Sequence, residues 1–150
     1  MIEPLKFKLT LNGSLIKVWH AWIQTEKVTA WFSPDAYIEP CLGGAYELFF
    51  DPSNHDHQST KGCKITIFDP MKSLGFTWKG PDHLASLMNK PSSLTSVRVD
   101  FTAKDERTQI EVEHSGWGEG KEWAEARDWH KKAWDGVLAN LKSVFNSRSD

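Results

Sequence analysis

The chain has 150 residues, with 18 lysines and arginines against 20 aspartates and glutamates, which gives a net charge of −2. This length fits one domain, and we expect a single domain spanning residues 1–150. The balanced charge excludes a broad basic surface of the kind that binds nucleic acid or anionic membranes. We find no apolar run long enough for a signal peptide or a membrane span, so the sequence predicts a cytoplasmic protein.

The first third of the chain predicts one strand followed by two short helices. Residues 5–11, LKFKLTL, alternate apolar and polar side chains as a half-buried strand does. Asn12 and Gly13 then form a turn, and Ser14 and Thr25 are candidate caps for the two helices. Pro34 ends the second helix, because proline cannot continue the helical hydrogen bonds.

The middle of the chain has a period of two, which is typical of strands. Each run has one apolar face, and turn-forming segments rich in Gly, Pro, Asn and Asp separate the runs. Strands that follow one another through such turns form an antiparallel, mostly meandering sheet. The predicted strands are residues 46–50, 63–67, 74–78, 97–101 and 110–114.

A long amphipathic helix is predicted at residues 122–141, and a polar tail, SRSD, follows at 147–150. At about 100° per residue, one side of this helix carries both apolar and polar side chains. That stripe must bury against the apolar face of the sheet. If the sheet curves around the helix, a cavity remains between them. The stripe consists of Trp123, Arg127, His130, Trp134, Val137, Leu138 and Leu141.

The order of these elements resembles a known family, and four segments carry the resemblance: VWHAWIQTEKVTAWFSP, PCLGGAYELFF, EHSGWG and WDGVLANLKSVF. The family is that of bacterial homologues of the activator of the heat-shock chaperone ATPase (AHSA-type), within the START-like, helix-grip superfamily often called SRPBCC. The resemblance implies an α+β fold in which a curved antiparallel sheet of six to seven strands wraps around the C-terminal helix, with a hydrophobic pocket between them. It implies no single activity, since related proteins bind lipids or polyketides and a few cyclise or hydrolyse them.

The matching segments differ in what they imply. Trp31-Phe32-Ser33-Pro34 and the glycine turn before Tyr46 match structural features of the family. His114-Ser115-Gly116-Trp117 resembles the end of the family's last strand. Strand alternation places His114 on the same inward side as its apolar neighbours at positions 110 and 112.

The polar side chains of the predicted interior define the candidate site. In a functional interpretation, Arg127 pairs with a ligand carboxylate or phenolate, and a histidine moves a proton near neutral pH. In the alternative that we favour, Arg127 reaches the rim, and each histidine is satisfied by a backbone carbonyl or by a glutamate such as Glu47. The candidate ligand-binding residues are Trp123, Arg127, His130, Trp134, His114, Cys63 and Trp78.

Metal and cofactor chemistry is not expected. The loop DPSNHDHQ at 51–58 offers carboxylate and imidazole donors, but polar residues are what a solvated turn requires. A Cys-His-His zinc site has the residue types but lacks ligand spacing, and two cysteines, Cys41 and Cys63, are too few for a disulfide framework. Motifs of nucleotide-binding and hydrolytic enzymes are absent from the sequence.

The leading hypothesis is a non-enzymatic protein that binds a small hydrophobic molecule between the C-terminal helix and the sheet. A first alternative is a cyclase or hydrolase that uses His130 or His114 as the proton carrier and Arg127 as the oxyanion stabiliser. A second alternative is a protein-interaction module. We expect no chaperone stimulation, because eukaryotic activators carry a further amino-terminal domain and this chain begins close to its first strand. The sequence leaves homodimerisation open.

Overall fold

The computed structural model describes residues 2–146, and the predicted polar tail at 147–150 lies outside the described residues. Seven strands and four α-helices lie in this part of the chain, together with one short 3-10 helix, η1. In chain order they are β1 (Leu5–Leu11), α1 (Leu15–Ile23), α2 (Thr25–Val28), β2 (Asp35–Ile38), β3 (Tyr46–Phe49), β4 (Ile65–Asp69), β5 (Ser73–Trp78), η1 (Asp82–Leu84), α3 (Ala85–Met88), β6 (Thr95–Lys104), β7 (Arg107–Ser115) and α4 (Lys121–Asn146).

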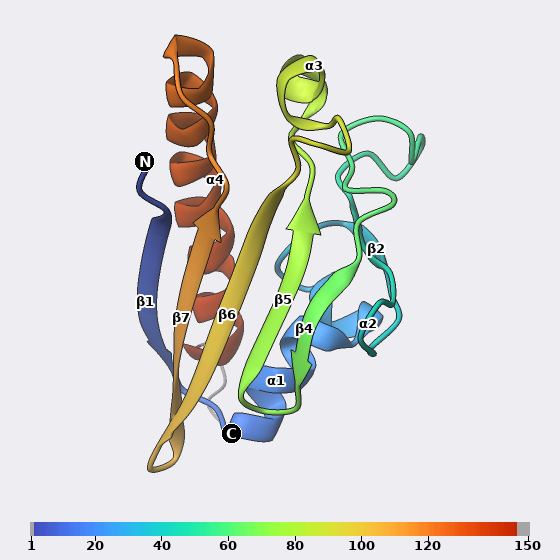
Figure 1. Cartoon of the computed structure of the whole chain (residues 1–150). Helices are drawn as coiled ribbons and strands as arrows, with labels where there is room; N and C mark the ends of the chain where they lie inside the picture. The colour runs from blue at the N-terminus through green and yellow to red at the C-terminus, as the bar shows by residue number, and fades with distance from the viewer. Residues whose placement is uncertain (1, 147–150) are drawn as a thin grey trace.

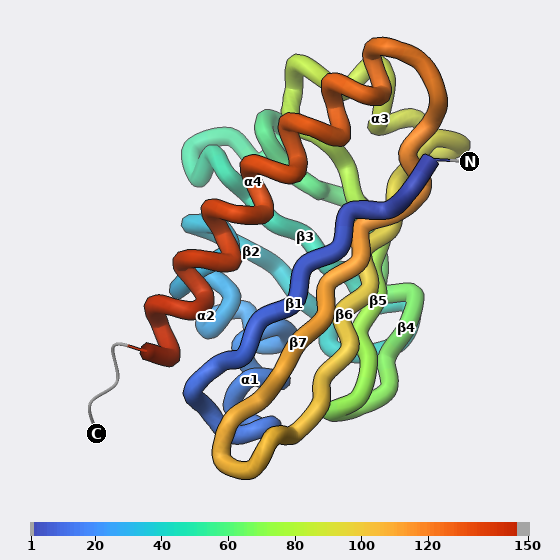
Figure 2. Tube along the Cα trace, turned by 90° about the vertical axis from the view of Figure 1, so that its left-hand side faces the viewer, coloured from blue at the N-terminus to red at the C-terminus, as the bar shows by residue number. Residues whose placement is uncertain are grey.

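The main sheet is antiparallel and has five strands in the order β1-β7-β6-β5-β4. Strand β1 therefore pairs with the last strand of the chain rather than with its neighbour in sequence. Helix α4 lies across one face of this sheet, and the opposite face is left uncovered (Figures 1 and 2). The predicted α+β, helix-grip architecture is confirmed.

The sheet is narrower than the six to seven strands expected. Strand β3 pairs with β2 in a separate two-stranded sheet. Two isolated bridges, Ala45 with Lys64 and Phe49 with Ser59, join its region to the segment that leads into β4. Backbone hydrogen bonds such as that from Tyr46 to Cys63 support this contact, but they do not form a ladder between β3 and β4.

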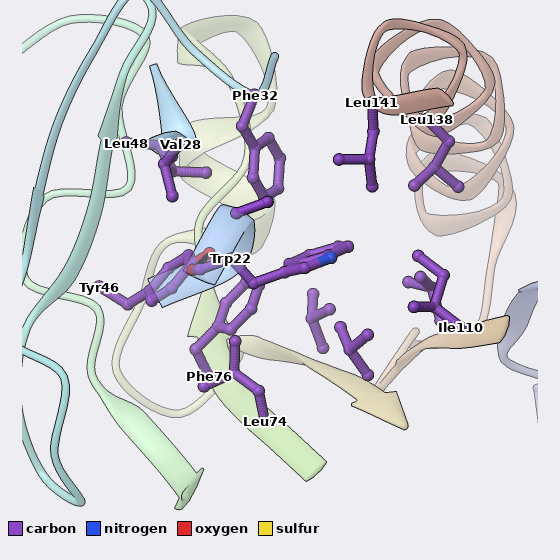
Figure 3. Close-up of a cluster of buried hydrophobic side chains, with 14 of the residues drawn as sticks. Trp22, Val28, Phe32, Tyr46, Leu48, Leu74, Phe76, Ile110, Leu138 and Leu141 are labelled. Atoms are coloured by element: carbon purple, nitrogen blue, oxygen red, sulfur yellow. Dashed lines mark hydrogen bonds between the residues drawn. The ribbon is translucent and has the colours of Figure 1, made fainter. Parts of the chain in front are cut away.

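The core forms where α1, the sheets and α4 meet. Along β6 the buried residues alternate with exposed ones, and Val99 lies opposite Val112 of β7 on the covered face. Figure 3 shows Trp22 of α1, Phe76 of β5 and Leu138 of α4 converging on one cluster. The sheet's period of two and the helix's period of 3.6 thus point their apolar side chains at each other.

The helix termini differ from the sequence prediction. Helix α2 ends at Val28, so the prediction that Pro34 ends it was wrong, and α4 continues beyond residue 141 to Asn146. Ser14 precedes α1 as expected, but its side chain makes no capping hydrogen bond. Gln24, not Thr25, occupies the N-cap of α2. The Thr25 hydroxyl instead accepts a hydrogen bond of 3.1 Å from the backbone N–H of Ile38, and so joins α2 to β2. The prediction of Thr25 as the cap was wrong by one residue.

Two glycines, one in a crowded turn and one on the open side of α4, give a matched test of the packing around them. A Cβ on Gly44 would lie 2.3 Å from the backbone oxygen of Glu39, whereas one on Gly136 of α4 would meet no atom within 4 Å. We expect Gly44→Ala to lower the free energy of unfolding by about 2 kcal/mol, because the backbone must shift. Gly136→Ala should raise it by up to about 1 kcal/mol through helix propensity. Urea unfolding measures both, and equal effects of the two variants would contradict the packing described.

Candidate functional site

A cavity of ≈ 430 Å³ lies between the middle of α4, the end of β5 and the loops that follow β3 and β5. Its floor is aromatic and buried, and its rim carries exposed aromatic and polar side chains. Such a volume lies within the range of roughly 300–1,000 Å³ that is typical of small-molecule sites. The lining residues are Phe32, Phe50, Gln58, Ser59, Trp78, Lys79, Gly80, Pro81, His83, Trp129, His130, Ala133, Trp134 and Val137.

Three aromatic rings from three parts of the chain build the floor. Phe32 follows α2, Trp78 ends β5 and Trp134 lies in the middle of α4. The ring centroids are 6.0 Å apart for Phe32 and Trp78, 5.5 Å for Phe32 and Trp134, and 5.8 Å for Trp78 and Trp134. These separations are those of attractive aromatic pairs, so the floor is a rigid apolar surface.

His130 borders the cavity, and both of its ring nitrogens are engaged. The indole N–H of Trp78 donates to Nε2 at 3.0 Å. Nδ1 lies 2.8 Å from the carbonyl oxygen of Ala126, one turn earlier in α4. An indole nitrogen only donates and a carbonyl only accepts, so His130 carries its proton on Nδ1. His130 is thus hydrogen-bonded to a backbone carbonyl, as in the alternative favoured from the sequence.

His114 of β7 lies behind the floor in the opposite tautomer. The indole N–H of Trp134 donates to its Nδ1 at 2.9 Å, and its Nε2 is 2.7 Å from the hydroxyl of Thr95. The neutral ring therefore carries its proton on Nε2 and donates it to Thr95. The His114 ring is fully buried and lies 5.4 Å from the ring of His130.

Burial keeps both histidines neutral. It lowers the pKa of His130 to about 4, against the weaker opposing effect of the Ala126 carbonyl. Burial also holds the pKa of His114 well below its ordinary value, and the neighbouring His130 adds to this effect. A base with so low a pKa takes up protons poorly near pH 7, which is the opposite of the tuning that acid–base catalysis requires.

Arg127 lies away from the cavity. Its Nε donates to the carbonyl oxygen of Glu3 at 3.0 Å, and its Nη2 donates to that of Pro4 at 3.3 Å. Arg127 occupies the edge of the α4 stripe next to the segment that enters β1, whereas the cavity opens at the opposite edge, at Trp129 and Ala133. The structure thus corrects the expected position of Arg127, which ties down the N-terminal segment.

The other candidate residues divide between the cavity and its surroundings. Trp78, His130 and Trp134 line it, and His114 supports it from behind. Trp123 packs near Trp117, with ring centroids 6.4 Å apart, and lies outside the cavity beside Arg127. Cys63 is buried elsewhere, where desolvation raises the pKa of its thiol despite a hydrogen bond with Thr77.

The mouth of the cavity is formed by the two loops that follow β3 and β5, and paired side chains hold these loops together. The backbone N–H of Gln58 donates to Asp82 at 2.9 Å, and that of Asp82 donates to the Gln58 side chain at 3.0 Å. His57 pairs with the same carboxylate at 2.8 Å. Asp82 raises the pKa of His57, first through this hydrogen bond and then through its charge.

The donors of the 51–58 loop are thus dispersed over separate partners, and His55 pairs with Asp35 of β2 at 2.8 Å. Within residues 2–146, no three His, Cys, Asp or Glu side chains come close enough together to hold a metal ion.

Sequence reasoning missed part of the lining. The predicted buried stripe includes Val137, but the predicted ligand-binding residues do not include Trp129, Ala133 or Val137. These three residues follow one another at intervals of four along α4, which was a readable signal. Phe50 and Gln58 lie in the loop after β3, and His83 lies in the short helix η1. Their contribution depends on the tertiary closure of two loops, and no periodic pattern in the sequence reports it.

The fold and the cavity define a helix-grip protein: an antiparallel sheet packed on a long C-terminal helix, with an apolar site between the two. Residues 13–146 match the family described as Activator of Hsp90 ATPase homolog 1-like protein. The chain belongs to this family, which confirms the family predicted from its motifs. No curated protein matches the chain.

Several solved structures share the fold. Protein MLL2253 from Mesorhizobium loti is 18% identical with a TM-score of 0.76, and the alignment covers 98% of each chain. The Aha1 dimer from Colwellia psychrerythraea is 17% identical with a TM-score of 0.73, over 97% of this chain and 96% of that one. PFC0360w, an HSP90 activator from Plasmodium falciparum, is 14% identical with a TM-score of 0.70, over 97% of each chain. Identities this low carry the fold alone.

For residues 2–146, the helices are all too short or too polar to span a bilayer.

Replacing Trp134 by phenylalanine tests the bond to His114. The variant keeps an aromatic ring but leaves the buried Nδ1 acceptor without its donor. We expect the free energy of unfolding to fall by about 2 kcal/mol, the usual cost of an unsatisfied buried group. Trp129→Phe is the matched control, because Trp129 is 41% exposed and water can satisfy its N–H. Equal stabilities of the two variants would show that the hydrogen bond from Trp134 to His114 does not stabilise the folded chain.

The lowered pKa of His130 predicts a pH dependence of stability. The unfolded chain takes up this proton near pH 6.5, whereas the folded chain takes it up only near pH 4. Stability is therefore complete above pH 6.5 and declines as the pH falls toward 4, by up to roughly 3 kcal/mol for this residue. NMR titration of the His130 ring, with urea unfolding across that range, measures both effects. A His130 ring that titrates near 6.5 would contradict the burial.

Proposed function

We propose that the protein binds a small hydrophobic molecule of lipid, polyketide or aromatic type in the cavity between α4 and the sheet. The observation that carries the proposal is the buried aromatic floor of the cavity. The site reaches the surface beside Phe50 and Trp129, whose side chains are 40% and 41% exposed. Exposed aromatic rings at the edge of an apolar cavity suit the entry of a greasy molecule.

The polar groups of the floor favour binding over catalysis by the candidate histidines. Trp78 and Ala126 already occupy the two nitrogens of His130. Arg127 donates to backbone carbonyls near the N-terminus and is too far round the helix to stabilise negative charge in the cavity. A cyclase or hydrolase that uses these residues would have to break the bonds that hold α4 to the sheet.

A chaperone partner is the second candidate function. It is favoured by membership of the Activator of Hsp90 ATPase homolog 1-like family and by the fold shared with the HSP90 activator of Plasmodium falciparum. Measuring the ATPase rate of a heat-shock chaperone with and without the purified protein tests this function. The dimer from Colwellia psychrerythraea likewise makes a homodimer worth testing, and light scattering decides its presence.

Filling the cavity tests the leading function. Ala133 of α4 is half-buried in the cavity wall, whereas Ala139 of the same helix is exposed. We screen a library of hydrophobic molecules by tryptophan fluorescence and melting temperature. A ligand at about 100 times its Kd stabilises the folded state by about 2.7 kcal/mol and raises Tm by several degrees.

Ala133→Trp should abolish this rise in Tm, because the new indole occupies the space of the ligand. Ala139→Trp should bind as the natural chain does. A library without a single micromolar ligand, or a ligand that binds Ala133→Trp unchanged, would refute the proposal.

A further inference from the structure

The deep polar atoms of the cavity have no hydrogen-bonding capacity left for a ligand. An imidazole nitrogen takes part in one good hydrogen bond, and an indole N–H donates one. Trp78 and Ala126 use both nitrogens of His130, and Trp134 donates its N–H to His114. A ligand group that reached these atoms would gain a bond only by breaking one.

The deep part of the cavity also has no charge to offer. His130 is neutral, and the described lining residues include no aspartate or glutamate. Lys79 is the one lysine or arginine among the described lining residues, and its ammonium donates to the carbonyl oxygen of the exposed Lys61 at 2.6 Å. A carboxylate or ammonium carried to the floor would therefore lose its hydration without a countercharge, which weakens its binding.

Polar groups that face solvent gather instead at the mouth. His83 stands edge-on to Trp129, with ring centroids 5.6 Å apart, and both side chains are exposed. Gln58 also lines the cavity and is exposed, and its side-chain oxygen accepts a hydrogen bond from the backbone N–H of Asp82. Gln58 and His83 are thus polar lining residues that can contact a polar substituent that stays near water.

We infer that the cavity selects flat, uncharged aromatic molecules whose single polar substituent remains at the mouth, beside Gln58 and His83. This inference rests on the proposed function and specifies its ligand class. The flat shape follows from the aromatic floor. The rings of Phe32 and Trp78 lie nearly parallel, with 20° between their planes and 6.0 Å between their centroids, and a further flat aromatic ring stacks favourably on such side chains.

Three derivatives of the same naphthalene ring, which differ in one small substituent, test the charge selection on the full chain at pH 7.5. They are naphthol, which is neutral, naphthoate, which is an anion, and naphthylmethylammonium, which is a cation. Calorimetry and tryptophan fluorescence give the Kd of each. We expect naphthol to bind at least about tenfold more tightly than either ion, because each ion loses hydration that the floor does not replace.

A substitution in the wall should reverse this preference. Val137 lines the cavity, and Val137→Lys brings an ammonium to it, so naphthoate should become the tighter ligand. Val137→Met has a similar reach without charge and should keep the preference for naphthol. The melting temperature of each variant reports that it folds, and the comparison on the natural chain stands if Val137→Lys does not fold.

The orientation is tested at the mouth. His83→Ala should weaken naphthol several-fold and leave methylnaphthalene, which has no polar substituent, unchanged. Equal losses for both probes, or no loss, would overturn the orientation.

The outcomes separate the two proposals. Equal affinities for naphthol and an ion overturn the charge selection and leave the proposed binding function intact. Failure of all three derivatives and of the hydrophobic library refutes both.

Discussion

Two indole–imidazole hydrogen bonds fasten the long helix to the sheet, and the site depends on them. One runs from Trp78 of β5 to His130 of α4, and the other runs from Trp134 of α4 to His114 of β7. The donor lies on the sheet in the first bond and on the helix in the second, so the two elements hold each other in both directions. Aliphatic packing alone is tolerant of small slides, whereas these directional bonds fix the position of α4 along the strands. The position of α4 in turn determines how the three aromatic rings of the cavity floor lie against one another.

This arrangement explains why polar residues lie beside an apolar cavity without making it polar. Histidine is usually a residue that changes charge near neutral pH. In this interior, burial and complete hydrogen bonding keep both rings neutral, and each ring serves as an acceptor for a tryptophan. Arg127, the one permanent charge expected beside them, faces the N-terminal segment instead. The polar side-chain atoms at the cavity floor are therefore already hydrogen-bonded to one another or to the backbone. Elsewhere in the described core, the indole N–H of Trp22 is buried without a partner.

The resemblance to a known family supplied the helix-grip arrangement. Periodicity was enough to predict most of the strands and the long helix, because each element buries a face that its spacing reveals. It also placed His130, Trp134 and His114 in the interior, as the structure has them. The same spacing could not assign Arg127, since a residue at the edge of a helical stripe faces one neighbour or the other according to tertiary packing. Nor could the spacing reveal that Gln58 and His83 line the cavity. Their positions depend on the hydrogen bonds between Gln58 and Asp82, which hold two separate segments together. The pairing of each histidine with a tryptophan joins residues up to 52 positions apart, a separation beyond the reach of any local pattern.

The two paired hydrogen bonds constrain how these buried residues can change in evolution. Losing a single member of Trp78–His130 or Trp134–His114 orphans its partner in a dry environment, so the four side chains are bound by strong epistasis. Descendants can exchange a donor only together with its acceptor, for example as an apolar couple of matching volume. Across relatives, the two members of each pair should accordingly change together. Such paired substitutions would replace a hydrogen-bonded pair in the cavity wall by an apolar pair.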